Sequence, residues 1–68
     1  MSVSTDREYI GLELKLARIR KGLHLYELAR QVGITPARLS QFEGGHRRPP
    51  PDLDEKLRVV LGLPLGRG

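Results

Sequence analysis

Glycine and proline residues divide this chain into four stretches, each long enough for a short helix. The breaks fall at residue 22, residue 33 and residues 44–45, 49–51 and 62–64. Within the stretches, apolar residues recur at spacings of three and four, and no stretch alternates with a period of two. The sequence therefore predicts an all-α fold of four short helices, without strands.

Capping residues set the expected helix bounds, which are about 6–21, 25–31, 35–43 and from 52 to about 61. Thr5 with Glu8, and Asp52 with Glu55, match the pattern of a capping box, in which two side chains satisfy free backbone N–H groups. Thr35 followed by proline is a favourable start for the third helix. Gly22 and Gly33 are expected to end the first two helices.

The length of 68 residues allows one small domain, which we expect at residues 6–62, with flexible ends at 1–5 and 63–68. A core of this size stabilises a fold by only about 3–5 kcal/mol. The chain has no cysteine and no cluster of metal-binding residues, so we expect no metal and no cofactor. We find neither an apolar run long enough to span a membrane nor a secretory signal, which predicts a cytoplasmic protein without membrane contact.

The chain is basic, with twelve Lys and Arg against eight Asp and Glu and a net charge of +4. A small basic domain attracts the phosphates of nucleic acids at long range. Net charge alone does not distinguish a nucleic-acid-binding protein from a protein with an ordinary basic surface. The positions of the charged residues in the fold are needed to tell the two apart.

The second and third stretches have the layout of a helix-turn-helix unit, in which two short helices are joined by a tight turn. Gly33 lies in the predicted turn, and the small Ala29 allows the two helices to cross closely. The crossing is expected to be fixed by four apolar residues, Leu28, Val32, Leu39 and Phe42. Such a crossing leaves the start and the outer face of the third helix free to enter a major groove of DNA.

The chain also resembles a known family over about residues 10–63. Three stretches agree with it in register, Ile10-Gly11-x-x-Leu14-x-x-Ala17-Arg18-x-x-x-Gly22-Leu23, Glu27-Leu28-Ala29-x-x-Val32-Gly33-Ile34 and Leu39-Ser40-Gln41-Phe42-Glu43-x-Gly45. They are similar to the three helices of the phage repressor and Cro-like proteins, also called the XRE family. The resemblance implies a lambda-repressor-like helix-turn-helix fold and a regulator that binds double-stranded DNA, typically as a dimer.

By position, the resemblance implies that DNA bases are contacted from the third helix by Ala37, Arg38, Ser40 and Gln41. Pro36 precedes them and has no N–H to donate, and Ala37 offers only a contact with a thymine methyl group. Gln41 suits an adenine edge, and Arg38 suits either a guanine or a phosphate. With so few polar side chains, discrimination between sequences is expected to be modest or to use the shape of the DNA.

The same resemblance implies contacts with the DNA backbone from six residues, Arg18, Leu25, Thr35, His46, Arg47 and Arg48. Leu25 would act through the N–H groups at the start of the second helix. Arg47 and Arg48 follow the helix that faces the groove, although an ordinary solvated basic loop is the alternative. In the family, the arginine at position 18 pairs with the glutamate at position 43 and so braces the third helix.

Two departures from the family bear on partners. Relatives often have a fifth helix that contributes to dimerisation, and this chain has no clear counterpart, so a homodimer stays open. Leu12 and Leu16 are apolar on the side of the first helix away from Ile10 and Leu14. They predict either an exposed patch for self-association or a protein partner, or else contacts with the terminal segments.

The leading functional hypothesis is a DNA-binding transcription regulator, with a repressor favoured, that places residues 35–43 in the major groove. The alternative is a small accessory or architectural DNA-binding protein, phage-like or antitoxin-like, that acts mainly through a protein partner. An enzyme is not expected. The sequence shows no pairing of nucleophile and base, no phosphate-binding glycine loop and no metal-ligand spacing.

Overall fold

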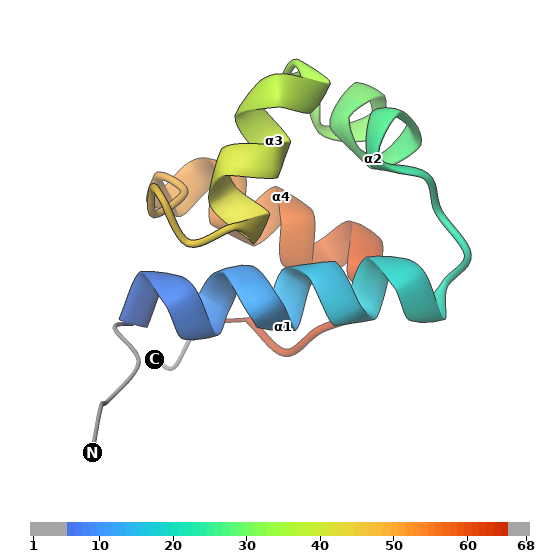
Figure 1. The fold of residues 1–68 in the computed structure, drawn as a ribbon. Helices are drawn as coiled ribbons and strands as arrows, with labels where there is room; N and C mark the ends of the chain where they lie inside the picture. The colour runs from blue at the N-terminus through green and yellow to red at the C-terminus, as the bar shows by residue number, and fades with distance from the viewer. Residues whose placement is uncertain (1–5, 66–68) are drawn as a thin grey trace.

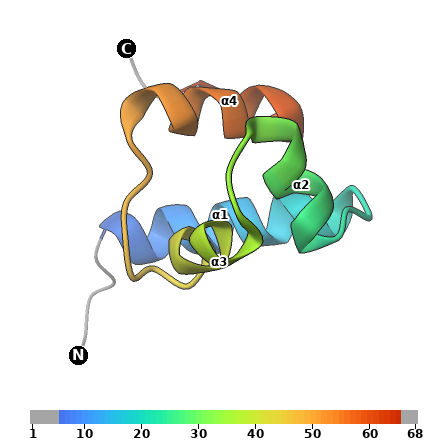
Figure 2. The same ribbon diagram turned by 90° about the horizontal axis from the view of Figure 1, so that it is seen from above.

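The structure is a computed structural model that describes residues 6–65, and it confirms the predicted all-α fold. It contains four helices, α1 (Asp6–Arg20), α2 (Leu25–Val32), α3 (Pro36–Glu43) and α4 (Pro51–Leu61). The helix α1 runs along one side, α3 and α4 pack against it, and α2 packs against α3 and α4 (Figures 1 and 2). Thr5 and the rest of the predicted flexible end at 1–5, together with residues 66–68 of the predicted flexible end at 63–68, lie outside the described residues.

The core contains one completely buried leucine from each helix, Leu14, Leu28, Leu39 and Leu57. Phe42, which is 1% exposed, is also fully buried. Each such side chain contributes about 1.5–3 kcal/mol when it leaves water, so these few residues account for much of the favourable free energy of folding. All four residues predicted to fix the crossing of α2 and α3 are buried.

The turn between α2 and α3 follows the predicted capping pattern. Gly33 has a φ of 79°, a left-handed conformation that glycine adopts without strain, and the N–H of Ile34 donates to the carbonyl of Ala29 at 2.9 Å. At the start of α3, the hydroxyl of Thr35 accepts a hydrogen bond from the N–H of Arg38 at 3.1 Å. These local contacts set the direction in which α3 leaves α2.

The predicted start of α4 is wrong by one residue, and its cap is different. The helix begins at Pro51, after Pro50, and no side chain caps it, so the expected capping role of Asp52 is not observed. A proline at the first helical position has no N–H that needs a partner, and its φ angle already suits a helix. The proline run therefore starts α4 by itself, and Asp52 and Asp54 in the first turn interact favourably with the helix dipole.

The helix α1 approaches α3 closely at Gly11. A Cβ atom at this position would overlap the carbonyl oxygen of Phe42 and would lie 2.7 Å from the carbonyl oxygen of Glu43. Both atoms belong to the backbone and cannot rotate away. Glycine at position 11 therefore sets how closely α3 lies against α1.

Arg58 joins α4 to α1 and to the segment that follows α4. Its Nε lies 3.1 Å from Asp54 Oδ2, its Nη2 lies 3.1 Å from Glu13 Oε1, and its Nη1 donates to the carbonyl of Pro64 at 3.3 Å. Burial alone would lower the pKa of Arg58, but the hydrogen bonds and charges of Asp54 and Glu13 outweigh it and raise that pKa. Leu63 packs against the core. The described part of the predicted tail thus contacts the helices, and the flexibility of 63–68 stays a prediction.

Replacing Arg58 with alanine is expected to lower the free energy of unfolding by about 2–3 kcal/mol, because two carboxylates lose their partner. Partial exposure of Glu13 (34%) and Asp54 (25%) keeps the loss below that of a fully buried ion pair. Urea unfolding followed by circular dichroism measures it. Arg20→Ala, an exposed arginine on α1, is the control, and an equal effect of the two substitutions would refute the role given to Arg58.

Candidate nucleic-acid interface

The outer face of α3 is formed by residues that point away from the core. Leu39, Phe42 and Glu43 are buried on the inner side of the helix. The four residues predicted to contact bases, Ala37, Arg38, Ser40 and Gln41, are all exposed. The helical period therefore separates a packing side of α3 from a side that is free to meet a ligand.

A shallow hollow of about 370 Å³ lies on this outer face. Its lining brings together five residues of the predicted site, Thr35, Ala37, Arg38, Gln41 and Arg47. They come from the cap of α3, from the helix itself and from the loop that follows it. Ser40, His46 and Arg48 are exposed but are not part of this lining.

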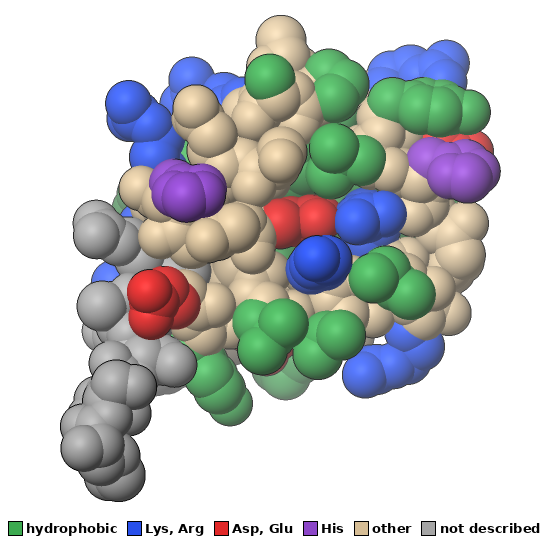
Figure 3. Space-filling view, in the orientation of Figure 1, with side chains coloured by type: hydrophobic (Ala, Val, Ile, Leu, Met, Phe, Trp, Pro, Cys, Tyr) green, Lys and Arg blue, Asp and Glu red, His purple; other side chains and the backbone are tan. Residues whose placement is uncertain are grey.

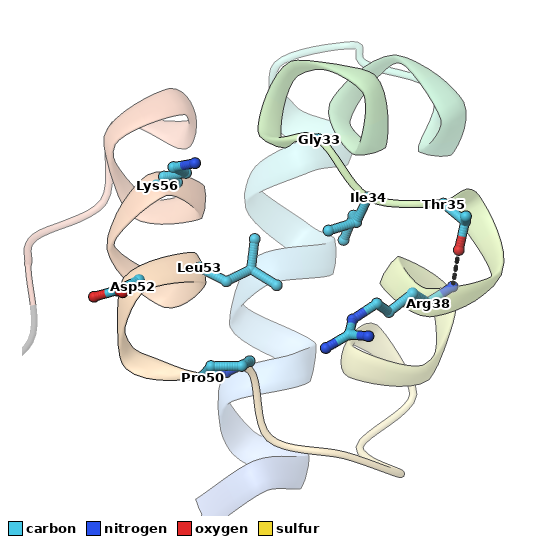
Figure 4. Close-up of a pocket in the computed structure, with 8 residues that line it drawn as sticks. All are labelled: Gly33, Ile34, Thr35, Arg38, Pro50, Asp52, Leu53 and Lys56. Carbon is cyan, nitrogen blue, oxygen red and sulfur yellow. Dashed lines mark hydrogen bonds between the residues drawn. The ribbon is translucent and has the colours of Figure 1, made fainter.

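Arg38 lies at the edge of the outer face, between α3 and α4. Its guanidinium carbon is 5.6 Å from the centre of the Phe42 ring, within the range of a cation–π contact. Figure 4 shows the side chain extending from α3 toward α4, into a groove that Ile34, Pro50 and Leu53 also line. Arg38 borders both this groove and the hollow on α3.

The loop after α3 carries three exposed basic or titratable side chains, those of His46, Arg47 and Arg48. Gly45 reverses the chain with a φ of 79°, and the N–H of His46 donates to the carbonyl of Gln41 at 3.0 Å. The loop is thus tied to the last turn of α3. Lys and Arg side chains gather beside α3 and this loop, at the upper left of Figure 3, so the outer face of α3 has a positively charged margin.

The pairing of Arg18 with Glu43 that the resemblance implies is present. Arg18 Nε lies 2.7 Å from Glu43 Oε2, and Nη2 lies 3.0 Å from Oε1, a two-pronged contact between side chains that are 13% and 6% exposed. The third nitrogen, Nη1, donates to the carbonyl of Leu23 at 2.9 Å. Arg18 therefore ties the end of α3 to α1, and its contact with a phosphate stays a prediction.

The start of α2 carries a hydrogen bond between Glu27 and His24, and the predicted contact of Leu25 with a phosphate stays a prediction. Leu25 is half-buried and packs against the core. Glu27 Oε1 accepts a hydrogen bond from the N–H of His24 at 2.7 Å, which places a negative charge where a phosphate would approach. Sequence reasoning missed this contact because histidine is not a usual capping residue, although the glutamate three positions later was a signal.

Comparison with known families decides the class of the protein. A family model described as helix-turn-helix matches residues 14–67, which is most of the chain. The chain belongs to the helix-turn-helix family. The match confirms the resemblance to the phage repressor and Cro-like (XRE) kind, a family of DNA-binding transcription regulators.

In this helix-turn-helix protein, α2 and α3 are the two helices of the motif, joined by the turn at Gly33. Searches of curated proteins and of solved structures found no match. Over residues 6–65, none of the helices combines the length and the apolar character needed to cross a membrane.

Proposed function

We propose that this helix-turn-helix protein represses transcription by placing α3, with its cap at Thr35, in the major groove of double-stranded DNA. The observation that carries the proposal is the hollow on α3, where Ala37, Arg38 and Gln41 lie beside Thr35 and Arg47. Residues suited to base edges and residues suited to phosphates thus share one exposed surface. A helix in the major groove needs this arrangement, because its flanks meet the two DNA strands.

Each residue of α3 has a role that follows from its chemistry. The amide of Gln41 donates and accepts together, which suits the N6 and N7 atoms of adenine. Ala37 contacts a thymine methyl group, and the hydroxyl of Ser40 bonds to a base edge of either kind. Arg38, at the edge of the helix, reaches a guanine or a phosphate by turning out of the groove beside α4.

The DNA backbone is contacted chiefly from the loop after α3. Arg47 and Arg48 bind phosphates as charged donors, and His46 adds a donor beside them. The hydroxyl of Thr35 accepts from Arg38 and keeps its own proton to donate to a phosphate. Arg18 and the N–H groups near Leu25 make weaker contributions, since Arg18 is held by Glu43 and the start of α2 carries Glu27.

Repression by occupancy requires only that the bound domain exclude RNA polymerase from a promoter. This action places the protein in the cytoplasm, with the DNA that it regulates. In vitro transcription tests it on a promoter that carries the preferred site, beside a promoter that lacks it. Transcript is expected to fall in step with occupancy on the first promoter alone. Unchanged or increased transcript at full occupancy would overturn repression.

Replacing Gln41 with alanine is expected to weaken binding to the preferred site by about 1–3 kcal/mol and to relax specificity at one base pair. Binding to unrelated DNA is expected to stay the same, because the amide does not contact phosphates. Fluorescence anisotropy with both DNAs measures the two affinities. The matched control is Gln31→Ala, an exposed glutamine on α2 outside the hollow. Equal losses on both DNAs would contradict the role given to Gln41.

An accessory or architectural role is the second candidate. It is favoured by the exposure of Leu12 (52%) and Leu16 (48%) and by the small number of polar residues on α3. Such a protein would bind DNA without sequence preference and would hold a different protein in a stoichiometric complex. Pull-down from a lysate together with the affinities for unrelated DNA distinguishes this role from the repressor.

A further inference from the structure

A groove of about 580 Å³ lies between the start of α3 and the first half of α4, and we call it the α3–α4 groove. Its lining includes the apolar residues Ile34, Pro50 and Leu53 and the cations Arg38 and Lys56. The volume falls within the roughly 300–1,000 Å³ of typical sites for small molecules. Eight residues line the groove, fewer than the roughly 20–30 that each partner contributes to a stable protein interface. Its size therefore suits a small molecule.

The middle of the α3–α4 groove is apolar. Figure 4 shows Ile34 and Leu53 pointing into the space between the two helices from opposite sides. Both side chains pack against the core but are only partly buried, so each keeps some apolar surface in the groove. A ligand with an apolar body gains free energy by covering such surface, whereas a hydrated inorganic ion does not.

Two cations border this apolar surface, Arg38 from α3 and Lys56 from α4. Within residues 6–65, neither of them forms an ion pair with a carboxylate. Asp52 also lines the groove, but Figure 4 shows its carboxylate pointing away from Arg38, toward the other side of α4. The guanidinium of Arg38 lies over the ring of Phe42, which keeps its N–H donors beside the apolar surface. The groove thus combines donors for an anion with apolar surface for the body that carries the anion.

We propose that the α3–α4 groove binds a small carboxylate with an apolar body. The carboxylate pairs with the guanidinium of Arg38, whose planar fork suits two parallel hydrogen bonds, and the body covers Ile34 and Leu53. Lys56 adds a second positive charge from the opposite helix. An inorganic anion lacks the apolar part of this match, and an uncharged apolar molecule lacks the partner for Arg38. The chemistry of the lining therefore selects a ligand that has both parts.

Such a ligand also acts on the binding of DNA, a consequence that rests on the proposed function. Thr35 and Arg38 border both the α3–α4 groove and the hollow on α3. In the proposed complex with DNA, Arg38 turns out of the groove to reach a guanine or a phosphate. A carboxylate paired with Arg38 holds the side chain in the groove and compensates its charge. The ligand is therefore expected to weaken DNA binding and to relieve repression.

Titration of the full chain with phenylacetate, followed by proton–nitrogen NMR, tests the site without DNA. We expect saturable shifts centred on the amides of Ile34, Arg38, Leu53 and Lys56, with a dissociation constant in the millimolar range. Phenylacetamide has the same ring without the charge, and acetate has the charge without the ring. Both are expected to bind about fivefold more weakly or less. Absence of saturable shifts, shifts centred on another surface, or equal affinity for phenylacetate and either control would overturn the proposal.

A pair of matched variants tests the role of Arg38 in the same titration. Arg38→Gln removes the charge and the two-pronged contact, and it is expected to raise the dissociation constant for phenylacetate about fivefold or more. The control is Arg30→Gln, which changes an exposed arginine on α2 outside the groove and should leave that constant unchanged. Circular dichroism verifies that both variants fold. Equal effects of the two substitutions would contradict pairing of the carboxylate with Arg38.

Fluorescence anisotropy with the preferred DNA tests the effect of the ligand on DNA binding. Saturating phenylacetate is expected to weaken binding by the wild-type chain about fivefold relative to acetate at the same concentration, and to change binding by Arg38→Gln only slightly. Equal DNA affinity of the wild-type chain in phenylacetate and in acetate would overturn the link between the groove and DNA. A chain that prefers no DNA sequence would contradict the proposed function, while the NMR titration would still decide whether the groove binds the carboxylate.

Discussion

Replacing Gly11 with alanine is expected to destabilise the domain by about 3 kcal/mol or more. The added methyl group would overlap the carbonyl oxygen of Phe42 and would press on that of Glu43, and neither oxygen can move without a shift of α3. A domain of this size has only about 3–5 kcal/mol of stability. We therefore expect a protein that is partly unfolded at room temperature. Urea and thermal unfolding followed by circular dichroism measure the loss.

The sign of the stability change caused by Gly11→Ala distinguishes two explanations. A clash with α3 predicts a loss of stability, whereas helix propensity alone predicts a gain. In a helix without tertiary contacts, alanine is more favourable than glycine by about 1 kcal/mol. A Gly11→Ala variant as stable as the wild type, or more stable, would show that α1 and α3 do not approach as described. Lys15→Ala, an exposed change on the same helix, is the control and should alter the free energy of unfolding by less than about 0.5 kcal/mol.

Removing both loop arginines, as Arg47→Ala with Arg48→Ala, is expected to weaken binding to all double-stranded DNA by about ten- to a hundredfold near physiological salt. The two side chains follow α3 directly, and both are exposed. Each phosphate contact releases about one counterion, so the slope of log affinity against log salt should fall by about two. Titrations at several salt concentrations give the affinity and the slope together.

The matched control removes the same charge from another surface. Arg20→Ala with Lys21→Ala also lowers the net charge by two, but these exposed residues lie at the end of α1 and outside the hollow on α3. This pair is expected to change affinity only slightly and to leave the salt slope nearly unchanged. If both double variants lose affinity equally, overall charge explains the binding and the loop has no special role.

The helices could be predicted closely from sequence because their causes are local. Glycines at 22 and 33 end helices through their own backbone freedom, and Thr35 caps α3 through a bond to a residue three positions away. The close approach at Gly11 could not be predicted, because it depends on where α3 lies in space. The same holds for Arg58, whose partner Glu13 is on another helix.

The candidate site was predictable to a different extent at each position. Burial of Leu39 and Phe42 requires that Ala37 and Gln41 face outward, so periodicity alone places them. The direction of the Arg38 side chain depends on the ring of Phe42 and on the position of α4. Neither of these can be predicted from the residues that neighbour Arg38 in the sequence. The hydrogen bond from the N–H of His24 to Glu27 at the start of α2 was not predicted, and the contact of Leu25 with a phosphate stays a prediction.

Selection of bound DNA from a random double-stranded pool tests the central claim most directly, because it asks whether the outer face of α3 discriminates between sequences. The wild-type protein is expected to enrich one common motif, and Gln41→Ala is expected to lose the preference at one position of that motif. A pool that binds the protein but converges on no motif would contradict sequence-specific recognition by α3.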